Sequence, residues 1–178
     1  MANVIQRTED IEVFFADLIT EITNIPDELT LLRYAKDGQG SHSIDTDCTY
    51  VSISEETDTR ANFKNRSYVK DIHGNIQNVV QQASRTLVLT CVFYGPNSYE
   101  LATLFNESLY LFEIKEKLDK MYLHIVSERT DGPIKTRELF NRQWYERTDL
   151  TLRFYNTIQI ESKAANFDSA NIQTVFDF

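Results

Sequence analysis

Residues 141–160 read NRQWYERTDLTLRFYNTIQI, a polar and aromatic run followed by an alternating apolar pattern. A side-chain period of two is typical of a β-strand with one buried and one solvated face. The run before the pattern contains Trp144, Tyr145 and Arg147, which are residue types enriched at protein interfaces. The stretch therefore predicts a strand whose entrance has a binding or packing role. The apolar positions of this strand are Leu150, Leu152, Phe154, Ile158 and Ile160.

Residues 85–94 predict a second strand, which we expect at the centre of the sheet. Every odd-numbered residue from Leu87 to Phe93 is apolar, and Val88 and Val92 keep the opposite face partly apolar. Apolar character on both faces is typical of a central strand. Shorter strands are predicted at residues 29–35, 48–54 and 122–127, and a hairpin is predicted to pair residues 68–72 with residues 76–80 and to continue toward Arg85.

Helical patterns lie between these strands. Residues 8–22 have apolar side chains at spacings of three and four, and Thr8 is their expected cap. After a break at Gly95 and Pro96, Asn97 and Glu100 have the spacing of a capping box at the start of a second helix. Residues 113–120 predict a charged helix or half-turn. The second helix is expected to cover the sheet with Leu101, Leu104, Phe105, Ser108, Leu109 and Phe112.

The remaining segments predict loops within a single domain of residues 1–178. Residues 36–46 form the most loop-like stretch, and residues 55–66 predict an exposed polar loop. Residues 130–133 predict a turn, and residues 167–178 predict a C-terminal arm or a closing strand. The expected fold is α+β, with a mixed or antiparallel sheet and amphipathic helices packed on one face.

The composition is that of an ordinary globular protein, with 178 residues of which 42% are hydrophobic. A formal charge of −9 argues against sequence-specific DNA binding. No apolar run reaches the roughly 18 residues of a membrane span, and the first residues lack the pattern of a signal peptide. We therefore expect a protein made and folded in a cytosol, with Cys48 and Cys91 as packed, reduced thiols and a disulfide as the alternative.

No catalytic, metal or cofactor site is predicted. His42, His73 and His124 each lack a second ligand at the spacing of a metal site. The scattered glycines form no phosphate-binding loop and no nucleophile elbow. The carboxylates at residues 45–47 and 55–58 lie in stretches that predict solvated loops, which favours a charged surface over acid–base catalysis.

Two interpretations of Trp144, Tyr145 and Arg147 remain open. The first is an interface hot spot, because these residue types dominate the binding energy of many interfaces. The second is an aromatic group at the edge of the core, with the arginine paired to Glu146 or Asp149.

Two motifs of the chain occur in a defined order. A strand ends in Phe93-Tyr94-Gly95-Pro96-Asn97, a helix follows, and residues 144–152 (WYERTDLTL) lead into the final strand. This order resembles the tail or neck terminator proteins of tailed bacteriophages. That family shows a strand ending in an aromatic-Gly-x-Asn step and a late aromatic-x-x-Arg-x-Asp-Leu strand entrance. The resemblance covers most of residues 5–160.

The resemblance implies a structural virion protein without enzymatic activity. Such a subunit assembles into a ring, commonly a hexamer, on the head-proximal end of the tail tube. The ring stops tube growth and joins the tail to head-completion proteins, and DNA passes through its lumen without specific binding. The protein would be assembled in the host bacterial cytoplasm and located in the tail or neck of the virion. The implied scaffold or subunit-contact residues are Tyr94, Asn97, Trp144, Tyr145, Arg147 and Asp149.

Two alternatives stay open at this point. Another head–tail connector or a tail-tube component would share the size, acidity and oligomeric habit of a terminator. A small metal-dependent hydrolase, with carboxylates bound to a divalent ion, is the alternative from a different class of protein. For a ring of chains with charge −9, we also expect some carboxylates to face the DNA path, where they would prevent trapping of the nucleic acid.

Overall fold

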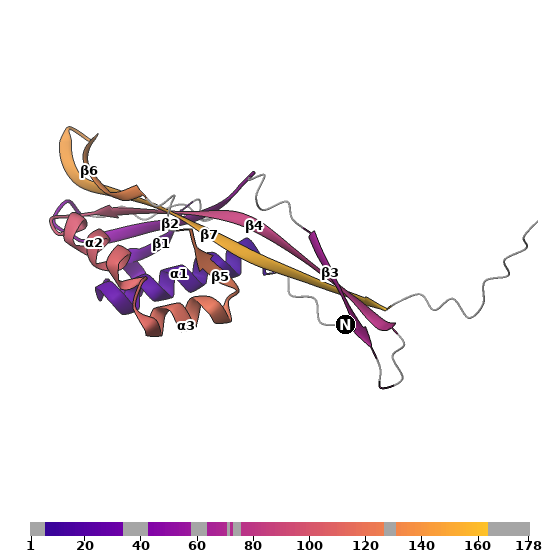
Figure 1. The fold of residues 1–178 in the computed structure, drawn as a ribbon. Helices are drawn as coiled ribbons and strands as arrows, with labels where there is room; N and C mark the ends of the chain where they lie inside the picture. The colour runs from indigo at the N-terminus through magenta and orange to yellow at the C-terminus, as the bar shows by residue number, and fades with distance from the viewer. Residues whose placement is uncertain are drawn as a thin grey trace, which may run out of the picture.

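In the computed structural model, the described residues are 6–33, 43–57, 64–70, 72, 76–126 and 131–163. Within these ranges the chain forms three α-helices and one mixed sheet of seven strands, and the helices lie on one face of the sheet (Figure 1). This arrangement confirms the expected α+β architecture. The helices are α1 (Thr8–Thr23), α2 (Ser98–Ser108) and α3 (Phe112–Lys120), with a 3₁₀ turn η1 (Asp27–Leu29). The strands are β1 (Thr30–Leu32), β2 (Cys48–Glu56), β3 (Lys64–Lys70), β4 (Ile76–Tyr94), β5 (Leu123–Ile125), β6 (Asp131–Phe140) and β7 (Gln143–Lys163).

Two long antiparallel strands, β4 and β7, form the centre of the sheet (Figure 1). They pair without interruption from Asn78 opposite Lys163 to Tyr94 opposite Arg147. Strand β2 pairs with the second half of β4 and β3 with its first half, while β6 and β5 pair with successive parts of β7. Strand β1 adds to β2 in parallel. The expected continuation of the hairpin arm through Arg85 is confirmed, because β4 is one strand of 19 residues.

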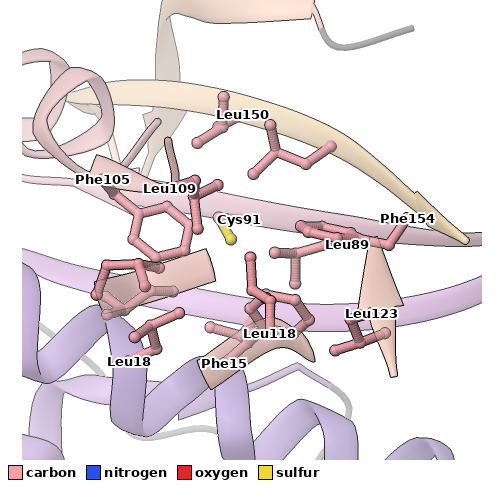
Figure 2. Close-up of a cluster of buried hydrophobic side chains, with 14 of the residues drawn as sticks. Phe15, Leu18, Leu89, Cys91, Phe105, Leu109, Leu118, Leu123, Leu150 and Phe154 are labelled. Carbon is pink, nitrogen blue, oxygen red and sulfur yellow. The ribbon is translucent and has the colours of Figure 1, made fainter. Parts of the chain in front are cut away.

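The main hydrophobic core lies between the helices and the middle of β4 and β7 (Figure 2). Leu89 and Cys91 of β4 and Leu150 and Phe154 of β7 are completely buried there. Phe15 of α1 packs against Phe154 with their ring centroids 5.0 Å apart. These contacts confirm which faces of the two central strands point inward. A fully buried Phe or Leu side chain contributes about 1.5–3 kcal/mol by leaving water.

A smaller apolar cluster lies on the other face of the sheet. It consists of Cys48, Tyr50 and Val92, with Tyr94 packed against it. The rings of Tyr50 and Tyr94 meet edge to face, with their centroids 5.8 Å apart. The expectation that the 85–94 strand is apolar on both faces and central is therefore confirmed.

The start of α1 differs from the prediction. Thr8 is the first helical residue and not the cap. Arg7 precedes it, has no side-chain capping hydrogen bond, and forms an ion pair with Asp10 over 2.9 Å. Asp10 lies in the first turn of α1, where a negative charge is favourable because of the helix dipole.

The predicted face of the second helix is wrong at two positions. Leu104 is 47% exposed and Phe112 is 74% exposed. Phe112 is outside the predicted face because α2 ends at Ser108 and a separate helix begins at Phe112, whereas Leu104 lies within α2 on its exposed side. The predicted Phe105 and Ser108 are buried, and Ser98 and Ala102, which were not predicted, complete the buried side of α2.

Two predicted connections are partly strands. The predicted loop at residues 55–66 is wrong at both ends, because β2 continues to Glu56 and β3 begins at Lys64. Polar, solvated strands lack the apolar alternation that would have revealed them. The predicted turn at residues 130–133 is wrong from Asp131 onward, since β6 begins there. The pairing of β6 with β7 shifts register between Asp131 and Ile134. The expected features at residues 36–42, 73–75 and 167–178 lie outside the described residues.

Candidate subunit-contact surfaces

The aromatic run of residues 143–149 lies inside a strand rather than at its entrance. Asn141 and Arg142 both have positive φ, 50° and 67°, and form a two-residue turn between β6 and β7. Two central residues with positive φ give the hairpin turn whose twist matches the flanking strands. Strand β7 consequently begins at Gln143, before the apolar alternation starts. This corrects the boundary predicted from the sequence.

The β6–β7 hairpin extends past the end of β4 (Figure 1). Because Tyr94 is the last residue of β4 and pairs with Arg147, the residues of β7 before Arg147 pair with β6 alone. Trp144 is 60% exposed there, and its cross-strand neighbour Leu139 is 57% exposed. The interpretation of Trp144 as an aromatic residue at the edge of the core is therefore wrong. The two side chains form an exposed apolar pair on projecting β-structure.

Arg147 is the centre of a partly buried polar cluster on the face of the sheet opposite the helices. Its Nε donates to Asp149 Oδ1 over 2.7 Å, and its Nη1 donates to Glu138 Oε2 over 3.0 Å. The hydroxyl of Tyr94 donates to the same Glu138 oxygen over 2.6 Å. The guanidinium also lies 5.9 Å from the centre of the Tyr94 ring. The structure thus brings together three of the predicted residues, Tyr94, Arg147 and Asp149, and adds Glu138.

The electrostatics of this cluster favour its present protonation state. The hydrogen bond to Asp149 raises the pKa of the Arg147 guanidinium; burial opposes this effect, and the bond to Glu138 adds to it. Burial, followed by the hydrogen bond to Glu138, raises the pKa of the Tyr94 phenol above its ordinary value of 10.0. A neutral tyrosine and a charged arginine bridged by carboxylates fix the geometry of the sheet where β4 ends. Such an arrangement holds the side chains of this surface in place.

The predicted pair between Arg147 and Glu146 does not form, because neighbouring residues of a strand point to opposite faces. Glu146 forms ion pairs with Lys135 over 2.8 Å and with Arg137 over 3.1 Å across the hairpin. The hydrogen bond from Lys135 is the main effect that lowers the pKa of Glu146. The other predicted pair, between Arg147 and Asp149, is confirmed.

Asn97 belongs to a different cluster, at the junction of β4 and α2. Its side chain does not cap the helix, so the predicted capping box is wrong. The Asn97 backbone N–H donates to Asp47 Oδ1 over 2.9 Å, and its side-chain amide donates to Asp47 Oδ2 over 2.7 Å. Asp47, which the sequence pattern placed in a solvated loop, therefore holds the start of α2. Gly95 makes this contact possible because its φ of +107° turns the chain directly beneath Asp47.

Sequence reasoning also missed a buried polar network around Asn156. This residue is 1% exposed and lies on the core side of β7. Its amide donates to Gln6 Oε1 over 3.0 Å and to the Tyr122 carbonyl over 3.2 Å, and its oxygen accepts from Arg85 Nε over 2.9 Å. The only available signal was a single Asn within an alternating apolar pattern. The network joins the N-terminal segment to the two central strands where the core ends.

Beyond this network, three strands continue as a ribbon that the helices do not cover (Figure 1). We call this ribbon the overhang: it consists of β3, residues 76–83 of β4 and residues 158–163 of β7. Every residue of β3 is exposed. Ile160, expected to face the core, is 41% exposed because the helical layer ends before it. The sheet therefore projects at both ends, as the hairpin at one end and the overhang at the other.

Other kinds of site find little support among the described residues. Cys48 and Cys91 are buried free thiols, and burial raises the pKa of Cys48 to about 12 and also raises the pKa of Cys91. Both thiols are thus protonated at neutral pH, which agrees with packed, reduced cysteines. In the described ranges, no group of three or more His, Cys, Asp and Glu side chains is placed to hold a metal ion. No helix there is long and apolar enough to cross a membrane.

An α+β domain whose exposed apolar and charged side chains gather on projecting β-structure is typical of a protein that assembles with other chains. The family model described as phage neck terminator protein matches residues 9–177, and the chain belongs to that family. It is therefore a structural protein of the bacteriophage tail and neck, as the resemblance implied. A search of curated proteins found no match.

Proposed function

We propose that this protein is the tail terminator of its phage. Copies of the chain form a ring, commonly a hexamer in such assemblies, on the head-proximal end of the tail tube. The ring stops tube growth, joins the tail to head-completion proteins and leaves a channel through which DNA passes. In this role the protein binds no cofactor and catalyses no reaction. Assembly takes place in the host cytoplasm, and the ring then resides in the virion.

The observation that carries this proposal is the family match over residues 9–177. The structure supports it through the two projecting ends of the sheet. A ring subunit must contact a neighbour on each side as well as the proteins above and below it, which requires several separate surfaces. The hairpin with Trp144 and the overhang with β3 supply exposed apolar and charged residues for such contacts. The polar cluster of Arg147 would then be scaffold that fixes the base of the hairpin.

Tube growth in the presence of the protein tests the proposal directly. Tail-tube protein is polymerised with and without this chain, and tube lengths and tube ends are recorded by negative-stain imaging. We expect shorter tubes with a ring on one end, while light scattering reports the mass of any assembly in solution. A protein that never binds a tube end would contradict the proposal. A monomer in isolation would not contradict it, because the tube can serve as template.

A second measurement separates this function from the alternatives. A tail-tube component would copolymerise along the tube, and its label would appear over the full tube length rather than at one end. A metal-dependent hydrolase would be stabilised by its ion, so thermal unfolding with and without Mg²⁺ or Mn²⁺ would differ. We expect end labelling and unchanged thermal unfolding.

A further inference from the structure

Within the described residues, the overhang is basic although the chain as a whole is acidic. Its strand β3 carries Lys64, Arg66 and Lys70 and no acidic residue, whereas the whole chain has a formal charge of −9. All three side chains are exposed, and none forms an ion pair with another residue in the described part of the chain. A solvated lysine or arginine needs no partner, but a row of them on one strand sets up a local positive potential.

The register of the ribbon places this charge beside uncovered apolar side chains. Arg66 pairs with Gln81, which in turn pairs with Ile160, so the three residues lie in one row across the sheet. The row continues the core side of β4, since odd-numbered β4 residues such as Leu89 face the helices. Tyr68 on the same side is 56% exposed and Ile160 is 41% exposed. The overhang thus presents a basic and apolar face that no described residue of the chain covers.

A matching acidic surface lies on the outer side of α1 and η1. Arg7 is the only basic residue between residues 6 and 32. Asp17, Asp27 and Glu28 are exposed and form no ion pair with a described residue. The exposed ridge of α1 also includes Val13, which is 48% exposed. We call this ridge and η1 the acidic face; its exposed carboxylates are Glu9, Asp10, Asp17, Glu21, Asp27 and Glu28.

The two surfaces have similar spacing along their length. Same-face residues of a strand, such as Lys64 and Arg66, lie about 6.8 Å apart. Residues four apart on a helix, such as Val13 and Asp17, lie about 6 Å apart. A helix can therefore lie along the overhang with its carboxylates close to the basic side chains and Val13 close to Tyr68. Opposite charges at such a contact steer association and select the partner.

We propose that the overhang of one copy covers the acidic face of α1 and η1 of a second copy of this chain. The two surfaces are different parts of the same subunit, so the contact is head to tail, and repeating it closes a ring when the rotation permits. The inference rests on the proposed function and deepens it, because it names the surfaces that join neighbouring subunits. It assigns the overhang to the ring and leaves the β6–β7 hairpin for other contacts.

A charge-swap experiment tests the proposal. In one variant, Lys64→Glu with Arg66→Glu makes the overhang acidic. In the other, Asp17→Lys, Asp27→Lys and Glu28→Lys make the opposite surface basic, because Asp10 and Glu21 already form ion pairs with Arg7 and Lys117. Each variant alone would set like charges against each other and assemble roughly tenfold less than wild type. Mixing the two restores complementary contacts in an alternating ring. Lys115→Glu with Lys120→Glu on α3 makes the same charge change as the first variant elsewhere, and we expect it to assemble normally.

Assembly is measured by light scattering and by the fraction of capped tube ends, at about 50 mM and about 500 mM NaCl. Circular dichroism and thermal unfolding confirm that each variant is folded. We expect wild-type assembly to weaken at the higher salt. Rescue in the mixture, and only in the mixture, supports the proposal.

Three outcomes overturn it. Variants that assemble like wild type would remove this contact while the proposed function stands. A mixture that fails to assemble, although both variants are folded, would show that the two surfaces do not meet. If the overhang variant assembles normally but binds double-stranded DNA less than wild type in a fluorescence titration, the basic strand is a nucleic-acid contact. A wild-type protein that never caps a tube would instead contradict the proposed function itself.

Discussion

Gly95 has the most constrained backbone position of the junction between β4 and α2. A Cβ atom at this residue would lie 2.4 Å from Asp47 Oδ1 and 2.7 Å from the Asp47 Cα. The second of these is a backbone atom, so the clash cannot be relieved by a side-chain rotation. The φ of +107° adds backbone strain for any residue with a side chain.

We therefore predict that Gly95→Ala lowers the free energy of unfolding by about 2–4 kcal/mol. Urea denaturation monitored by circular dichroism measures the change. Gly132→Ala in β6 is the matched control, because an added Cβ there meets nothing within 4 Å. Equal stabilities of the two variants would show that the junction can rearrange.

Arg147 and Arg137 lie on neighbouring strands of one hairpin but differ in burial. The Arg147 side chain is 27% exposed and that of Arg137 is 68% exposed. We predict that Arg147→Ala costs about 1–2 kcal/mol, because Glu138 and Asp149 lose a shared partner. Arg137→Ala should cost less than about 0.5 kcal/mol, as exposed ion pairs contribute little. Chemical denaturation of the two variants makes the comparison, and a larger cost for Arg137→Ala would contradict it.

Tyr94 gives the protein a predictable response to alkaline pH. Because the fold raises its pKa above 10.0, the unfolded chain releases the phenolic proton at a lower pH than the folded chain. Above pH 10 the unfolded state thus binds fewer protons, and this contribution to stability is lost as the pH rises. We predict that wild type is about 0.5–1.5 kcal/mol more stable than Tyr94→Phe at neutral pH. The difference should shrink above pH 10 in denaturation curves; a constant difference would contradict the linkage.

At the scale of elements, the sequence predicts the parts of β4 and β7 that lie on the core. Their apolar alternation at Leu87–Phe93 and Leu150–Phe154 arises because every second side chain is buried there. Such a pattern reveals only the buried part of a strand. The same pattern is silent about residues 64–67 of β3 and about the outer half of β6, which lack an apolar alternation. Residues 68–70 of β3 were predicted, as part of the hairpin with β4. These strands exist because a neighbouring strand supplies hydrogen-bond partners, which is a tertiary effect.

In the candidate site, too, local contacts are predictable from the sequence and contacts between distant residues are not. The pairing of Arg147 with Asp149 is predictable because two residues of one strand share a face. The contact of Asp47 with Asn97 joins residues 50 positions apart, so no local pattern shows it. Asn156 was visible only as an exception to the apolar alternation. Its partners Gln6 and Arg85 come from other elements and become apparent only in the folded chain.

The overhang and the core should also differ in their dynamics. Strand β3 is exposed along its whole length, whereas Leu87–Phe93 of β4 is enclosed by β2, β7 and the helices. We predict that amides of β3 and of residues 158–163 exchange with solvent at least about tenfold faster than those of the enclosed segment. Hydrogen-exchange mass spectrometry on the free subunit measures this. In the assembled ring the overhang should become protected, and equal rates in both states would argue against its burial on assembly.

At the scale of the whole molecule, we expect the exposed residues of the β6–β7 hairpin and of the overhang to contribute to assembly but little to folding stability. Trp144 and Leu139 are largely exposed and support no core contact. We predict that Trp144→Ser combined with Leu139→Ser changes the free energy of unfolding by less than about 0.5 kcal/mol. The same variant should bind tube ends or head-completion proteins at least about tenfold more weakly, because Trp is a frequent hot spot. Unchanged binding in a co-sedimentation assay would show that the hairpin tip has no contact role.

The continuous pairing of β4 with β7 also has a mechanical consequence. Strand β7 has 21 residues and is therefore about 70 Å long. If neighbours hold the two ends of the sheet, tension along the strands loads the ladder from Asn78 to Tyr94 in shear, so many hydrogen bonds resist together. Pulling one strand sideways would instead break those bonds one after another. We therefore expect the subunit to resist force along its long axis more strongly than force across it.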